Sequence, residues 1–128
     1  MFARKVSVRL KPDSLGEFAS LIESKILPWL RRQDGFLDLI ILALPDSSEV
    51  ATISFWDREA DAQAYNSSGY PEAVQILEQL LDGIPYVKTF KVVSSTFQML
   101  ARAREPQAGD LAPDSPAQLG YQSHETSV

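Results

Sequence analysis

The chain has 128 residues, of which 45% are hydrophobic, and its formal net charge is −5. This length predicts one domain with a substantial core. Because the charge is acidic and the Lys and Arg residues are not clustered, nucleic acid is excluded as an expected partner. The chain has no cysteine, which excludes disulfides, thiolate metal sites and a cysteine nucleophile.

No apolar run approaches the roughly 18 residues of a membrane span, and the N-terminus has no apolar signal core. We therefore expect a cytoplasmic protein with no membrane partner.

The first third of the chain predicts a strand followed by a helix. Residues 2–10 alternate between apolar and polar side chains, which is typical of a half-buried strand. Arg9 lies on its polar face. Residues 15–29 then carry an apolar helical stripe, and Pro28 should bend this helix because it lacks a backbone N–H group.

The middle of the chain predicts a hairpin and a second helix. Residues 36–44 and 50–56 read as strands on either side of a loop. Asp57 is a good N-cap for the following helix. This helix should break at residues 66–69, after which Pro71 fits a fresh first turn. A last strand is predicted from Tyr86 to about Gln98.

The resulting order, strand-helix-strand-strand-helix-strand, predicts an α+β, ferredoxin-like split βαβ fold. Two helices should cover one face of a four-stranded antiparallel sheet. Residues 36–44 are apolar on both faces, however, with one set comprising Phe36, Ile40, Leu42 and Leu44 and the other Leu37, Leu39, Ile41 and Ala43. The second face needs a cover that the core does not supply, so we expect a homodimer that forms a dimeric α+β barrel.

Composition changes near residue 100. Residues 1–100 form the predicted ferredoxin-like domain, and residues 101–128 form a Pro/Ser/Gln-rich tail with few large apolar groups. Such a segment buries too little surface to offset its ordering entropy.

Several short motifs carry a family resemblance. They are the Lys11-Pro12 turn, the Gly35-Phe36 opening of the second strand, and Phe55-Trp56-Asp57 followed by Glu59-Ala60 and Tyr65. On these residues the segment from Met1 to Gln98 resembles the antibiotic biosynthesis monooxygenase-like family. That resemblance implies a dimeric α+β barrel with a cleft between sheet and helices, and members that include cofactor-free oxygenases, haem-degrading enzymes and isomerases.

The resemblance also allows the branches of the family to be compared at single positions. Trp56 matches a tryptophan of the polyketide-quinone oxygenases, whereas their Asn, Tyr and Arg positions fall on Thr52, Ala62 and Ile76. Haem degradation is disfavoured, because the first strand lacks an Asn and the expected His position falls on Gln75.

Five residues are candidates for a site. Trp56 could stack on a flat substrate, although sealing the end of the strand is the alternative. Tyr65, Asn66 and Tyr70 cluster at the predicted helix break, where either phenol could stack on a ligand or hold and release a proton. Tyr65 is the catalytic candidate. Packing of the two rings with wet tips is the alternative reading. Arg9 could bind an enolate or carboxylate, or instead pair with Asp38 across the sheet or dimer.

Three functions remain open at this point. The first is a cofactor-independent monooxygenase acting on a small aromatic or quinol-type molecule. The second is an isomerase or cyclase using the same cleft. The third is a non-catalytic protein that binds a small molecule or another protein. The sequence has no P-loop, dinucleotide fingerprint, histidine cluster or Ser-His-Asp set, so we expect neither a cofactor nor a metal.

Overall fold

The computed structural model of the chain describes residues 1–97. The helices and strands of this part lie in the unit formed by Met1–Lys91. The predicted tail, residues 101–128, lies outside the described residues.

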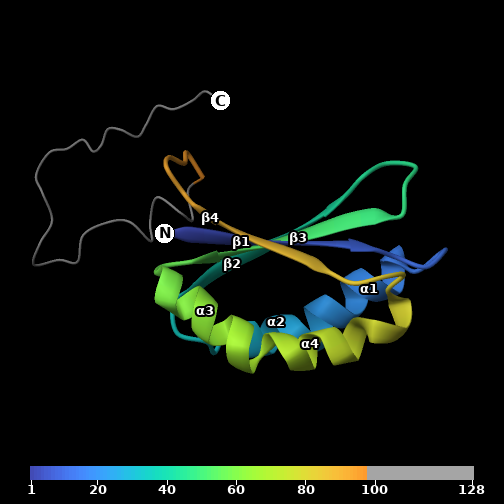
Figure 1. Ribbon diagram of the computed structural model, residues 1–128, viewed down its shortest axis with the longest axis horizontal. Helices are drawn as coiled ribbons and strands as arrows, with labels where there is room; N and C mark the ends of the chain where they lie inside the picture. The colour runs from blue at the N-terminus through green and yellow to red at the C-terminus, as the bar shows by residue number, and fades with distance from the viewer. Residues whose placement is uncertain (98–128) are drawn as a thin grey trace, which may run out of the picture. The chain divides into compact units, whose positions relative to one another are not determined.

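Four antiparallel strands form a single sheet within this unit. They are β1 (Phe2–Arg9), β2 (Phe36–Ala43), β3 (Glu49–Trp56) and β4 (Tyr86–Lys91), in the spatial order β2-β3-β1-β4. The helices cover one face of this sheet (Figure 1). The predicted ferredoxin-like fold is therefore confirmed. The sequence had predicted a last strand that continues to about Gln98, but β4 ends at Lys91.

The first helical segment is interrupted where the proline was expected to disturb it. It consists of α1 (Leu15–Leu21), a π-helical turn η1 (Ile22–Ile26) and α2 (Leu27–Leu30). The Leu27 N–H donates to the carbonyl of Ile22, five residues back, which widens the turn just before Pro28. A wider turn accommodates a proline ring that a regular α-helix would not.

The second helical segment breaks at Gly69, between α3 (Glu59–Ser68) and α4 (Tyr70–Leu77), and ends in the 3-10 turn η2 (Glu78–Leu80). The prediction that Asp57 caps α3 was wrong. Arg58 holds the N-cap position without a side-chain cap, and the Asp57 N–H instead donates to the Gly35 carbonyl at 2.8 Å. This contact ties the end of β3 to the start of β2.

An irregularity in β2 changes which of its residues face the helices. Phe36 pairs with Trp56, but Asp38 pairs with Phe55, so the register shifts between them. Phe36 therefore packs against the core together with Leu39 and Ile41. The predicted grouping of Phe36 with Ile40 and Leu42 was wrong, because a bulge reverses the alternation at this point.

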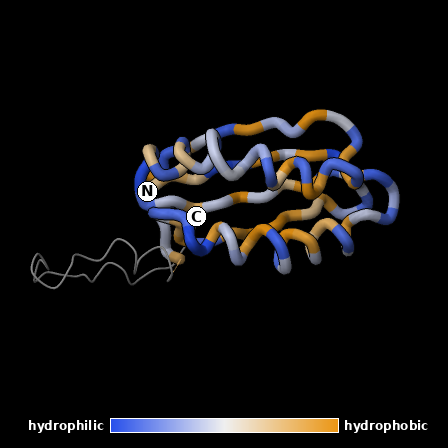
Figure 2. Tube along the Cα trace, turned by 90° about the horizontal axis from the view of Figure 1, so that it is seen from below, coloured by the Kyte–Doolittle hydropathy of each residue, from blue (hydrophilic) through white to orange (hydrophobic). Residues whose placement is uncertain are grey.

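The core lies between the sheet and the helices. Phe18 and Trp56 are its largest fully buried side chains. Seen from the helix side, apolar and polar segments alternate along the helices, as expected for elements with one buried face (Figure 2). The opposite face of the sheet, which we call the helix-free face, carries Ile40, Leu42, Ile53, Tyr86 and Phe90.

Candidate functional site

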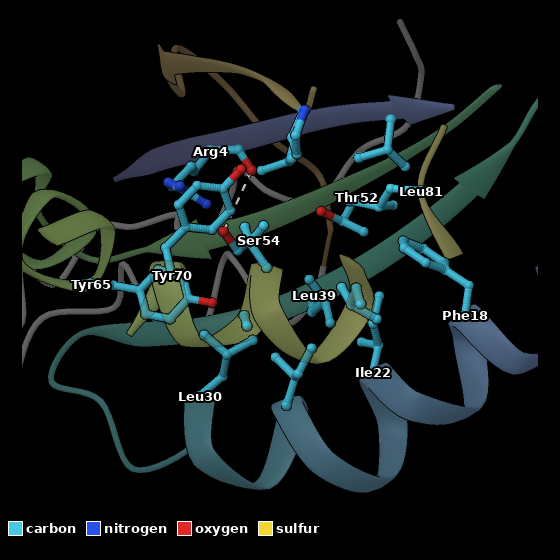
Figure 3. A pocket seen from close by; sticks show the side chains of 17 residues that line it. Arg4, Phe18, Ile22, Leu30, Leu39, Thr52, Ser54, Tyr65, Tyr70 and Leu81 are labelled. Carbon is cyan, nitrogen blue, oxygen red and sulfur yellow. Dashed lines mark hydrogen bonds between the residues drawn. The ribbon is translucent and has the colours of Figure 1, made fainter. Parts of the chain in front are cut away.

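A pocket with a volume of about 60 Å³ lies between the sheet and the helices. Most of its wall is apolar, with Phe18, Ile22 and Leu30 from the first helical segment. Its polar side chains are Arg4, Thr52 and Ser54 from the sheet and Tyr65 and Tyr70 from the second helical segment. Figure 3 shows Arg4, Tyr65 and Tyr70 at one end and Phe18 and Leu81 at the other. The pocket is thus an apolar space with one polar end.

Arg4 dominates the charge of that polar end. It is only 3% exposed, although it is fully charged at neutral pH. Its guanidinium donates a hydrogen bond of 2.6 Å to Asn66 Oδ1. The guanidinium carbon lies 4.0 Å from the ring centroid of Tyr70 and 5.4 Å from that of Tyr65. The cation is therefore held by one amide and two aromatic rings.

Burial shifts the pKa values of Arg4, Tyr65 and Tyr70. It raises the pKa of Tyr65 to about 12, although the charge of Arg4 opposes this shift. Burial likewise raises the pKa of Tyr70, again against the effect of Arg4. Burial lowers the pKa of Arg4, while the two tyrosines act in the opposite direction. Both phenols consequently keep their protons at neutral pH, and they can donate hydrogen bonds to a ligand but do not act as resting bases.

Trp56 lies behind the pocket and does not line it. Its side chain is completely buried, and its indole N–H donates to Ser54 Oγ at 2.8 Å. One face of the indole stacks on Tyr65, and Phe36 packs edge-on at a centroid distance of 5.5 Å. Trp56 thus supports Tyr65 from behind, which agrees with the strand-sealing alternative.

Close packing also fixes the break between α3 and α4. A Cβ atom on Gly69 would lie 2.7 Å from Trp29 Cη2 and 2.8 Å from Tyr65 Cε1, so any larger residue would displace these rings. Tyr65 is therefore restrained on two sides, by Trp56 and by the contact of Gly69 with Trp29. Tyr70 follows the break directly and is only half-buried.

The structure brings together four of the five predicted site residues. Tyr65 and Tyr70 line the pocket. Asn66 accepts a hydrogen bond from Arg4, which lines the pocket, and Trp56 stacks on the ring of Tyr65. Arg9 is not part of this group. It is exposed and donates from its guanidinium to Ser48 Oγ at 2.8 Å, near the β2–β3 loop.

The expected pairing of Arg9 with Asp38 does not form within residues 1–97. Arg9 pairs in register with Glu49, at one end of β3, whereas Asp38 pairs with Phe55 at the other end. The carboxylate of Asp38 instead accepts a hydrogen bond of 2.8 Å from the Leu39 N–H.

Sequence reasoning missed Arg4, but the sequence contains a signal for it. Arg4 has the same phase in the strand as Val6, Val8 and Leu10, so a charged residue lies on the apolar face of β1. Charged side chains are rarely fully buried unless they are paired. A charge in the buried phase of an alternating strand is therefore a feature to be examined.

Within the described residues, no cluster of three or more His, Cys, Asp or Glu side chains could hold a metal ion. In the same part of the chain, no helix has the length and apolar character needed to cross a bilayer.

Known proteins with this fold share its sheet and helices at low sequence identity. A protein of unknown function from Nitrosomonas europaea is 20% identical, with a TM-score of 0.62 over 73% of this chain and 90% of that one. A monooxygenase from the ActVA-Orf6 gene of Streptomyces coelicolor, solved with nanaomycin D, is 20% identical, with a TM-score of 0.60 over 73% and 88%. SnoaB, a cofactor-independent oxygenase from Streptomyces nogalater, is 16% identical, with a TM-score of 0.61 over 73% and 94%.

At these identities the similarity establishes the fold alone. No functionally curated protein matches the chain by sequence. The sequence profile described as antibiotic biosynthesis monooxygenase, however, matches residues 1–77, which include β1, β2, β3 and both helical segments as far as α4. The chain belongs to the antibiotic biosynthesis monooxygenase family.

Proposed function

We propose that the chain binds a small phenolic or quinol molecule in the pocket and oxygenates it with O₂, without a cofactor. One observation carries this proposal: a buried phenol, a half-buried phenol and a buried guanidinium meet at one end of an otherwise apolar pocket. Such a pocket suits a flat ring with a single polar end. Membership of the antibiotic biosynthesis monooxygenase family supports the same proposal, and the solved structures similar to this chain include a cofactor-independent oxygenase.

The chemistry needs little from the protein beyond binding and orientation. An ionised phenol is electron-rich and can donate electrons to O₂ directly. In the conversion of a phenol to a para-quinone, one oxygen atom of O₂ enters the ring. The other oxygen atom leaves as water, which contains the former hydroxyl proton and the former ring hydrogen. The substrate loses four electrons, which O₂ takes up, so no other oxidant or reductant is required. Holding the ring in a water-poor pocket beside O₂ is the contribution left to the protein.

We assign Tyr65 as a hydrogen-bond donor to the oxygen of the substrate. Because its pKa is raised to about 12 by burial, it holds its proton throughout the neutral range. It can therefore stabilise a developing oxyanion without becoming charged. The stack on Trp56 keeps the Tyr65 ring in place. Asn66 holds the guanidinium of Arg4 at the same end of the pocket.

The size of the pocket limits the substrate. A volume of about 60 Å³ is smaller than the roughly 150 Å³ of an engineered protein cavity that binds benzene. A phenolic ring therefore enters only if a wall residue moves. Tyr70 is the member of the aromatic group that can do so, because it is half-buried and follows directly after the break at Gly69. We expect small, single-ring substrates to be preferred.

The test is oxygen consumption with a dimethylphenol, using its methyl ether as the non-ionisable control. Turnover should consume one O₂ for each quinone formed, and isotopically labelled O₂ should leave one labelled atom in the quinone. The methyl ether should not react. A product of unchanged mass without oxygen uptake would instead identify an isomerase or cyclase, and binding without any product would identify a binding protein.

A variant separates the proposed role of Tyr65 from simple packing. Tyr65→Phe keeps the ring and its stack but removes the hydroxyl, so turnover should fall by about 10²–10³-fold, the usual effect of losing one oxyanion donor, with nearly unchanged binding. Ser67→Ala is the control, because it removes a hydroxyl from an exposed position on α3 that does not line the pocket. Equal activity of the Tyr65 variant and the control would remove Tyr65 from the mechanism.

We also propose that the active form is a homodimer joined through the helix-free face. Leu42, Tyr86 and Phe90 are 49%, 61% and 47% exposed on this face, with Ile40 and Ile53 between them in the sheet. The same face also carries Lys5 and Lys88, which lie in register with Ile53. Exposed apolar groups gathered on one face of a sheet are typical of interaction surfaces.

A further inference from the structure

Arg4 occupies a position that does not favour a charge. It lies in β1 between apolar residues of the same face and is 3% exposed, beneath the helices. Removing a charge from water costs several kcal/mol unless paired groups compensate for it. The position is therefore costly for folding, and hydrophobic residues of similar length would suit it better.

The groups around Arg4 compensate only in part. Tyr65 on α3 and Tyr70 on α4 are neutral phenols at neutral pH, as argued above. Asn66 is a neutral amide, and the cross-strand neighbours of Arg4, Ser54 on β3 and Thr89 on β4, are also uncharged. The only ion pair within residues 1–97 joins Arg58 to Asp61, so no carboxylate in this part of the chain neutralises Arg4.

The guanidinium also retains unused hydrogen-bonding capacity. It carries five N–H donors, of which one donates to Asn66, and the Tyr70 hydroxyl is a second hydrogen-bond partner within the described residues. One face of the group is covered by the Tyr70 ring, a contact that an incoming aromatic ring can replace. Figure 3 shows the two side chains together at the end of the pocket.

We propose that Arg4 is the receptor for an oxyanion, so that the pocket binds its aromatic ligand as a conjugate base. The ligand class is a single ring with one ionised oxygen, a phenolate or enolate, with the oxygen on Arg4 and the ring against the apolar wall. This inference deepens the proposed function and rests on it in taking the pocket as the ligand site. A buried cation that has no acid partner within residues 1–97 favours the ionised over the neutral form of the same molecule.

The experiment is a spectrophotometric titration with para-nitrophenol, whose ionised form absorbs at a different wavelength and which ionises near neutral pH. In the presence of excess protein the apparent pKa of the probe should fall by at least about one unit, which corresponds to tenfold tighter binding of the phenolate. para-Nitroanisole, the methyl ether, has the same ring and cannot ionise. It should bind more weakly than the phenolate, and with no dependence on pH across the neutral range.

The variants test whether Arg4 causes the shift. Arg4→Met should abolish it, leave binding of para-nitroanisole unchanged, and leave the protein as stable as the wild type or more stable. Arg4→Lys keeps the charge and should preserve a downward shift even if Arg4→Met does not fold. A probe that binds without a shift, a shift that survives in Arg4→Met, or the absence of binding of both probes at millimolar concentration would each overturn the proposal.

The outcome is independent of turnover. A shifted probe pKa together with no oxygen consumption would leave Arg4 as an anion receptor and refute the oxygenase. Oxygen consumption together with an unshifted probe would refute the role of Arg4 alone.

Discussion

Trp56 and Tyr65 stack with their ring centroids 5.4 Å apart and their planes at 28°, so that a fully buried ring supports one that lines the pocket. The indole is itself fixed by its hydrogen bond to Ser54. The place where β3 ends and α3 begins is thus a structural support whose outer layer faces the ligand site. We therefore expect changes at Trp56 to affect mainly the free energy of unfolding, and changes at Tyr65 to affect mainly the ligand site.

Trp56→Phe is expected to destabilise the protein by about 1–2 kcal/mol, because it leaves an imperfectly packed space and removes the hydrogen bond to Ser54. Binding of a phenolic probe should weaken by less than tenfold, which is equivalent to about 1.4 kcal/mol. Urea unfolding and probe titration measure the two effects. Unchanged stability combined with lost binding would show that Trp56 is part of the pocket wall.

The element order and the helix break were predictable because they depend on local signals. Alternating side chains, an apolar helical stripe and the Gly69–Pro71 break act within a few residues of one another. The family resemblance rested on equally local motifs, and it placed three of the polar site residues in one short segment around the break.

The parts that failed depend on how distant segments meet. The face of Phe36 depends on a bulge that forms only when β2 pairs with β3. Arg4 is the exception, because its place in the apolar phase of β1 was a local signal that the sequence already contained. The cap at Arg58 depends on the backbone contact between Asp57 and Gly35, which no local propensity describes.

Tyr65 should make stability depend on alkaline pH. Its pKa is raised by burial from 10.0 to about 12 in the folded chain. Between these values the unfolded chain loses the proton and the folded chain keeps it, so stability is present below pH 10 and is lost as the pH rises towards 12. The contribution is about 1.4 kcal/mol per pH unit in that window.

The measurement compares urea unfolding of the wild type and Tyr65→Phe from pH 9 to 11.5, since Tyr70 and other groups also contribute to the total. The stability of the wild type relative to Tyr65→Phe should fall as pH rises, and Ser67→Ala, which changes no ionisable group, should run parallel to the wild type. Parallel curves for Tyr65→Phe would show that the hydroxyl ionises normally.

Gly35→Ala should be strongly destabilising, for two reasons. The residue has φ +79°, a conformation that L residues rarely adopt, and an added Cβ would overlap the carboxylate of Asp61. A cost of at least about 1–3 kcal/mol is expected from the backbone alone. Thermal unfolding measures it.

Gly16→Ala is the matched control, because Gly16 lies in α1 and a Cβ there meets nothing within 4 Å. That variant should gain up to about 1 kcal/mol from helix propensity. Adding Asp61→Ala to Gly35→Ala should recover only part of the steric loss, because the Cβ of residue 61 would still lie 2.7 Å from the added Cβ. If Gly35→Ala were as stable as the wild type, the backbone at this turn would differ from the structure.

The last prediction concerns association through the helix-free face. An apolar face carrying Leu42, Ile53 and Phe90 has no covering element on it among the helices and strands of residues 1–91, and a standard interface of about 1,600 Å² would bury much of it. Light scattering at micromolar concentration should therefore give about twice the chain mass of 14.2 kDa. Ile53→Lys adds a third lysine beside Lys5 and Lys88 in the middle of this face, so like charges would meet across the interface. It should yield a monomer that keeps its helical circular dichroism. Gln63→Lys, on the exposed side of α3, adds the same charge elsewhere and should remain dimeric. A wild-type monomer under these conditions would rule out the dimer and with it the closed barrel, and a dimer in both variants would place the interface on another surface.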